Sequence, residues 1–139
     1  MLRIVPVLCL TLMLWSCGGG APPGPERYHV SGKVTYDGKP VPFGSILFDP
    51  DASAKNSGPQ GTAEIRDGFY DTSKAGGKGT VGGPMIISIM GTTHATLTEG
   101  GEGKVIFSGY TEKKDLPKEK TTLDFDIPLI DESAKKKKK

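Results

Sequence analysis

The chain consists of short runs of β-branched and aromatic residues, and glycine, proline, aspartate and asparagine separate these runs. It contains 20 glycines and 11 prolines among 139 residues. Beyond the N-terminal region, no stretch repeats apolar residues at the three- and four-residue spacing of an amphipathic helix. Such a chain can bury its apolar side chains only by pairing strands. We therefore expect an all-β fold.

Seven segments have the composition of strands, and two Asp-Gly pairs predict tight hairpins between them. Asp37-Gly38 and Asp67-Gly68 favour the positive φ angles that two-residue hairpin turns require. One segment, 85–90, is nearly all apolar and predicts a strand buried on both faces. The seven segments are 28–36, 42–49, 61–66, 69–72, 85–90, 104–111 and 121–129. This spacing predicts a single seven-stranded antiparallel β-sandwich over residues 28–130.

The segment 30–42, VSGKVTYDGKPVP, and the Ile46-Leu47-Phe48 that follows resemble the opening of the carboxypeptidase regulatory-like, or transthyretin-like, β-sandwich. In that family a V-x-G-x-V run is the first strand and a later G-x-Y lies at a hairpin, as Gly68-Phe69-Tyr70 would. The whole chain is also similar to small lipoproteins of this class from planctomycete-type bacteria. The resemblance implies a β-sandwich in the cell envelope with an accessory or binding role. It brings no catalytic residues.

Residues 1–16 predict a lipoprotein signal peptide, because a charged start at Arg3 is followed by an apolar run and by the small Ser16. The apolar run is shorter than the roughly 20 residues that a membrane-spanning helix needs. Leu14-Trp15-Ser16-Cys17 resembles the lipobox of bacterial lipoproteins. We expect cleavage before Cys17, and two or more acyl chains on this residue would anchor the protein durably. An ordinary cleaved export signal is the alternative.

Two polar segments flank the expected domain. Residues 17–27 are rich in glycine and proline and predict a tether. Residues 131–139 end in five lysines, Lys135 to Lys139, and predict a disordered, solvated tail. Contact of these lysines with anionic lipid or with an acidic envelope polymer is a second interpretation, and an engineered tag is a third.

Charge and cysteine content exclude several classes of function. Between Cys17 and Ala134 there are 12 Lys and Arg against 16 Asp and Glu, so the expected domain is mildly acidic. It lacks the clustered basic and aromatic residues of a nucleic-acid interface. Cys9 would leave with the signal peptide and Cys17 would carry lipid. No thiol then remains for a disulfide, a zinc site or a nucleophile.

No residue pattern predicts catalysis, a metal site or a cofactor. His29 and His94 have no metal-ligand spacing, and the Asp49-Pro50-Asp51 run lacks the glycine and glutamate of a calcium loop. Residues 76–80, GGKGT, do not have the residue order of a phosphate-binding P-loop. Asp124 and Asp126 share one strand face, which solvated alternation explains better than a paired-carboxylate site. We expect a protein that is not an enzyme.

The sequence thus predicts a membrane-anchored lipoprotein of the bacterial cell envelope, on the periplasmic or the outer-surface side. We expect a non-catalytic structural or protein-binding module whose partners are the lipid bilayer, through Cys17, and an unidentified envelope protein or polymer. Two long loops, 51–59 and 73–83, are the candidate contact surfaces, because they contain few expected core residues. A carbohydrate- or polymer-recognition domain and an accessory subunit of an envelope enzyme are the alternatives. The sugar alternative is weakened because the only Trp, Trp15, lies in the signal peptide and because we expect the Tyr and Phe side chains mostly at inward strand positions.

Overall fold

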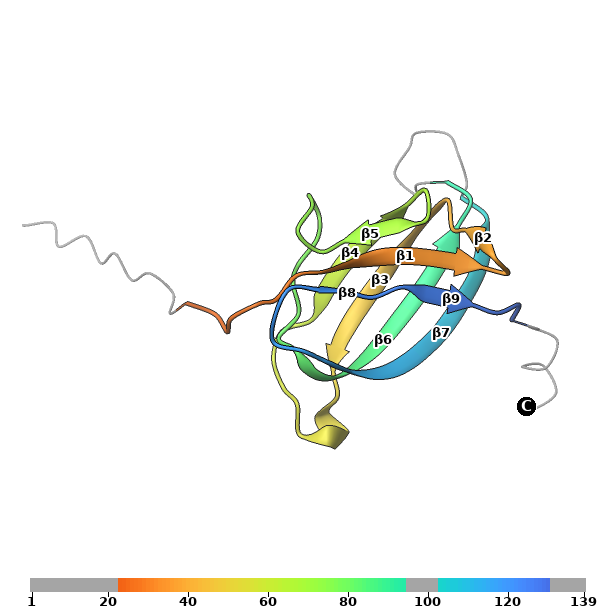
Figure 1. The fold of residues 1–139 in the computed structure, drawn as a ribbon. Helices are drawn as coiled ribbons and strands as arrows, with labels where there is room; N and C mark the ends of the chain where they lie inside the picture. Colours follow the sequence, from red (N-terminus) through yellow and green to blue (C-terminus); the bar gives the residue numbers. More distant parts are fainter. Residues whose placement is uncertain (1–22, 95–102, 131–139) are drawn as a thin grey trace, which may run out of the picture.

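The domain is built from paired strands (Figure 1). The computed structural model describes residues 23–94 and 103–130. Within these ranges the one helical segment is the 3-10 turn η1, Ala52–Ala54, and no helix is long and apolar enough to cross a membrane. The expected all-β fold is confirmed. The strands are β1 Val30–Tyr36, β2 Lys39–Pro40, β3 Phe43–Pro50, β4 Gly61–Arg66, β5 Phe69–Asp71, β6 Gly83–Thr92, β7 Val105–Leu116, β8 Thr121–Thr122 and β9 Phe125–Ile127.

The strands form one continuous sheet that curls into a half-barrel. Its order is β2-β1-β5-β4-β3-β6-β7, and β8 and β9 pair with β1. In Figure 1, β1 and β9 consequently lie in front of β3, β6 and β7. Inside the curl the ring of Tyr36 on β1 stacks on Phe107 of β7, with ring centroids 4.7 Å apart. β1 and β7, which are far apart in the order of the sheet, therefore share one core.

The expected seven-stranded antiparallel sandwich differs from the structure in strand number and pairing. The described residues form nine strands. The short β2 was not expected, and the expected strand 121–129 is divided into β8 and β9. Both β8 and β9 run parallel to β1. The reason is that the chain leaves β7 at the end of the domain where β1 begins, and it then follows β1 in the same direction. Hydrogen bonding does not separate the strands into two sheets.

The two hairpin turns form where the sequence predicts them. Asp37 and Gly38 have φ angles of 51° and 70°, and Asp67 and Gly68 have φ angles of 51° and 77°. Positive φ at both central residues defines the type I′ turn, whose twist matches that of the flanking strands. These turns connect β1 to β2 and β4 to β5.

Alternating side chains of every long strand fill the core, and each large one stabilises the fold by roughly 1.5–3 kcal/mol. On β6 the buried side chains are Met85, Ile87 and Ile89, whereas Met90 is 39% exposed. The expectation of a strand buried on both faces is therefore wrong, because on the outer face of β6 Ile86 and Ser88 are only half-buried and Met90 is exposed. Other large buried side chains are Val30, Val34, Ile46, Phe48, Ile65, Phe107, Phe125 and Ile127.

The end of the expected tether belongs to the folded domain. One guanidinium nitrogen of Arg27 donates to the carbonyl oxygens of Gln60 and Gly79 at 3.1 and 2.7 Å. Tyr28 then forms an isolated bridge to Thr80. Of the expected tether, residues 17–22 lie outside the described residues.

A hydrogen bond beneath β1 joins three neighbouring strands. Gly32 on β1 lies directly opposite Tyr70 on β5. The Tyr70 hydroxyl reaches past Gly32 and donates to the Leu123 carbonyl, between β8 and β9, at 2.6 Å. A Cβ at Gly32 would collide with that same carbonyl oxygen. The position therefore requires glycine, because the Leu123 carbonyl and the Asp124 carboxylate occupy the space that a side chain would take.

Replacing Gly32 with alanine should destabilise the domain by about 2 kcal/mol or more, because the added methyl group must displace the Leu123 carbonyl from beneath the sheet. Urea denaturation would measure the change in the free energy of unfolding. Gly24→Ala is the matched control, since no atom lies within 4 Å of a Cβ built there. Equal stability of the two variants would contradict this account of Gly32.

Candidate functional site

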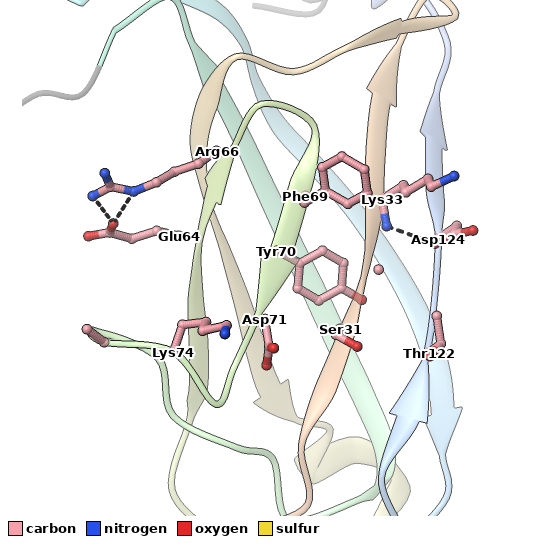
Figure 2. A pocket seen from close by; sticks show the side chains of 12 residues that line it. Ser31, Lys33, Glu64, Arg66, Phe69, Tyr70, Asp71, Lys74, Thr122 and Asp124 are labelled. Carbon is pink, nitrogen blue, oxygen red and sulfur yellow. Dashed lines mark hydrogen bonds and ion pairs between the residues drawn. The ribbon is translucent and has the colours of Figure 1, made fainter.

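A hollow of about 550 Å³ lies on the outer face of the sheet, over β4, β5, β1 and β8 (Figure 2). Two rows of outward side chains cross these strands. The pairing places Arg66 opposite Phe69 and Phe69 opposite Lys33, which gives the first row. The second row contains Asp71, Ser31 and Thr122, which are also direct partners across the strands. We call this hollow the outer-face groove.

The exposed ring of Phe69 is the central feature of the groove. Phe69 is 59% exposed, although its neighbour Tyr70 is buried, because successive side chains of a strand point to opposite faces. The Lys33 ammonium lies 5.9 Å from the centre of the Phe69 ring. An exposed phenyl ring on a flat sheet face offers apolar area to a ligand.

Charged groups of both signs surround this ring. The Arg66 guanidinium forms a 2.7 Å ion pair with Glu64 on the same strand. Lys33 and Lys74 form no ion pair with any described residue. On the far side, Asp124 accepts a 2.8 Å hydrogen bond from the Lys33 backbone N–H (Figure 2). The groove therefore presents both hydrogen-bond donors and acceptors.

Asp71 remains ionised and oriented in the groove. The backbone N–H and the hydroxyl of Ser73 donate to one of its oxygens at 2.8 and 2.6 Å. These hydrogen bonds, together with the charges of Lys74 and Lys120, hold the pKa of Asp71 below its ordinary value. Its second carboxylate oxygen accepts no hydrogen bond from the described residues.

Beneath the floor, the Tyr70 phenol is neutral. Burial raises the pKa of its hydroxyl far above the ordinary value, and the negative charge of Asp124 adds to this shift. The hydroxyl donates a hydrogen bond to the Leu123 carbonyl oxygen. Tyr70 therefore serves as a support for the floor of the groove.

The two loops that the sequence favoured as contact surfaces do not line most of this groove, and both support the fold. Asn56 donates to the carbonyl oxygens of Gly82 and Pro84 at 2.9 and 2.7 Å, which ties loop 51–59 to loop 73–83 and to β6. In the second loop Thr80 and Val81 are buried. Loop 51–59 has no buried apolar residue and loop 73–83 has one, Val81, so the expectation that these loops contain few core residues is confirmed. Of the two loops, only the beginning of loop 73–83, at Lys74 and Ala75, borders the groove.

The other residues weighed from the sequence lie apart from one another. His29 precedes β1 and His94 follows β6, so the two imidazoles are at opposite ends of the sheet. Among residues 23–94 and 103–130, no three His, Cys, Asp or Glu side chains form a group that could hold a metal ion. Cys17, the signal peptide 1–16 and the lysine tail 131–139 lie outside the described residues.

The carboxylates that the sequence paired have separate partners. Asp49 accepts from the Gln60 amide, and Asp51 binds Lys113. Asp124 borders the groove, while Asp126 accepts from the Thr35 hydroxyl. In the Gly76–Thr80 run, the N–H groups of Lys78 and Thr80 donate to Thr62 and Tyr28 and so are not free to bind a phosphate.

Sequence reasoning missed the groove because it placed the Tyr and Phe side chains mostly inward. The signal was present in Gly68-Phe69-Tyr70, since two successive strand residues cannot both face the core. In the structure Tyr70 faces inward, opposite Gly32, and Phe69 faces solvent. No family model matches the chain, and comparison with curated proteins and with solved structures finds no match.

Asp51 is a source of pH-dependent stability. Its side chain is 7% exposed, and it accepts from Lys113 at 2.9 Å and from Ser53. The hydrogen bonds from Lys113 and Ser53 lower the pKa of Asp51 to about 2. An unfolded chain has an aspartate pKa of about 3.9. The ionised carboxylate therefore stabilises the fold above about pH 4, and this contribution is lost as the pH falls toward 2.

Asp51→Asn should flatten the decline of stability between pH 4 and pH 2 and should lower stability at neutral pH. Thermal unfolding followed by circular dichroism at a series of pH values would measure this. Asp115→Asn is the control, because the exposed Asp115 side chain forms no ion pair with the described residues. An Asp51→Asn profile parallel to that of the unaltered protein would rule out this role.

Proposed function

We propose that this chain is a lipid-anchored protein of the bacterial cell envelope whose β-domain is a non-catalytic binding module. The observation that carries the proposal is the outer-face groove, in which the exposed Phe69 ring is surrounded by charged side chains. Concave sites with an apolar surface and a few oriented polar groups are the usual form of a binding site. Anchorage rests on Leu14-Trp15-Ser16-Cys17, and acylation of Cys17 would place the groove on the outward side of the membrane.

A non-catalytic role is supported by the chemistry of the groove. Neither histidine lines it, and its one hydroxyl with a strongly shifted pKa, that of Tyr70, is held by the Leu123 carbonyl. Asp71 is the direct partner of Ser31 across the strands, but the Ser31 hydroxyl forms no hydrogen bond with it or with any other described residue. Binding without reaction is the simplest use of such a surface.

We also propose that the curled sheet is a variant of the transthyretin-like sandwich. The two motifs that suggested the resemblance are neighbours, because Gly32 of the V-x-G-x-V run lies opposite Tyr70 of the G-x-Y run. The same contact explains why one motif needs glycine and the other needs tyrosine: Tyr70 donates a hydrogen bond past Gly32 to the Leu123 carbonyl.

The ligand of this module is either a protein or a carbohydrate or other polymer, and we favour the carbohydrate. Its supporting observation is that Phe69 faces solvent, whereas the sequence analysis expected the aromatic side chains to lie mostly inside. Flat aromatic rings bind the apolar faces of sugars, and the surrounding carboxylates and ammonium groups can bind hydroxyls.

The anchor is tested by Cys17→Ala. This variant should move the protein from the membrane to the soluble fraction, because no acyl chain can then be attached. Fractionation followed by immunoblotting would measure the distribution, and Cys9→Ala is the control because Cys9 would leave with the signal peptide. Full membrane association of Cys17→Ala would remove the anchor from the proposal.

The binding surface is tested by placing a photoreactive phenylalanine analogue at position 69 and, in separate proteins, at positions 54 and 129. Ala54 lies in the loop 51–59, and Leu129 is an exposed apolar residue outside the groove. Irradiation of intact envelopes should give a cross-linked product at position 69 and none at position 129. Cross-linking at position 54 alone would return the contact to the loop and would contradict a role for the groove.

A further inference from the structure

We propose that the outer-face groove binds a neutral sugar chain, which stacks one ring on Phe69 and crosses the strands from β4 toward β8. This inference rests on the proposed binding function and names the class of ligand. Three features of the groove carry it: the exposed ring, the balance of charge and the arrangement of donors and acceptors.

The stacking surface is Phe69. Its ring is 59% exposed and lies in the first row between Arg66 and Lys33. Exposure of this ring to water is unfavourable, so a ligand with an apolar face would gain free energy by covering it. The C–H groups on one face of a sugar ring carry slight positive charge, and the face of a phenyl ring is negative. Stacking of the sugar face on the Phe69 ring is therefore electrostatically favourable.

The balance of charge selects a neutral ligand. Three cations, Lys33, Arg66 and Lys74, line the groove together with three anions, Glu64, Asp71 and Asp124. A polyanion would be attracted by the two unpaired ammonium groups but repelled by Asp71 and Asp124. A polycation would be attracted by these carboxylates but repelled by the ammonium groups. A neutral, hydroxyl-rich chain avoids both, because each hydroxyl can donate to a carboxylate or accept from an ammonium group.

The arrangement of the polar groups suits a ligand longer than one sugar. In Figure 2, Asp71 and Lys74 lie on one side of Phe69, and Lys33 and Asp124 lie on the other. Neighbouring strands are about 4.8 Å apart, so the four paired segments span about 14 Å, or about two to three hexose rings. The floor between the flanking groups is formed by the small residues Ser31 and Gly32, which leaves room for the chain to approach the sheet.

The test uses the full chain in detergent micelles and calorimetric titration with three probes. The neutral probes are cellohexaose and the hexamer of N-acetylglucosamine, and the acidic probe is hexagalacturonate. At least one neutral hexasaccharide should bind, with an affinity that changes little between low and high salt. Phe69→Ala should weaken this binding at least tenfold, and Phe69→Trp should preserve or strengthen it.

Leu129→Ala is the matched control, because it also removes an exposed apolar side chain, 67% exposed, but outside the groove. Its affinity should equal that of the unaltered protein. The inference is overturned by the absence of binding of both neutral probes at millimolar concentration, or by equal affinities of Phe69→Ala and Leu129→Ala. It is also overturned by tighter binding of hexagalacturonate that weakens with salt.

These outcomes separate the inference from the proposed function. Cross-linking at position 69 in intact envelopes, together with no binding of neutral hexasaccharides, would leave the binding module in place and give it a ligand of another class. Absence of cross-linking at position 69 and absence of sugar binding would remove both.

Discussion

The hydrogen bond from Tyr70 to the Leu123 carbonyl determines much of the rest of the structure. It passes beneath Gly32 and so joins β5, β1 and the segment between β8 and β9. This part-buried hydrogen bond helps to hold the C-terminal segment against β1, together with the backbone pairing of β8 and β9 and the hydrogen bond from the Leu123 N–H to the Ser31 carbonyl. Because β8 and β9 close one side of the half-barrel, the same bond helps to enclose the core.

The inward position of Tyr70 also determines the binding surface. A strand side chain that faces inward places its neighbours outward, so Phe69 and Asp71 must face solvent. The segment that the Tyr70 hydroxyl holds brings Thr122 and Asp124 to the edge of the same face. One hydrogen bond beneath the sheet thus supports the core on one side and arranges the groove on the other. This is the physical link between the fold and the proposed function.

Much of the secondary structure could be predicted from local sequence. Asp-Gly pairs determine the two type I′ turns through their tolerance of positive φ, and alternation identified the strands around them. Pairing between distant strands could not be predicted in this way. The parallel approach of β8 and β9 to β1 depends on where the chain leaves β7, and no local pattern contains that information. The structural duties of loops 51–59 and 73–83 were missed for the same reason, since they rest on contacts such as those of Asn56.

The sequence by itself determined that the chain pairs strands, where its tight turns lie, and that Cys17 follows a signal-like segment, because each of these properties is contained in a few consecutive residues. The predicted hairpin at Asp67-Gly68 already places Arg66 opposite Phe69. The tertiary structure alone decided that Lys33 and Asp124 lie beside them, because these two residues come from segments that are distant in the sequence. The groove is a property of that register. A shift of one residue in the register between β1 and β5 would turn Phe69 toward the core, and the groove would lose its exposed ring.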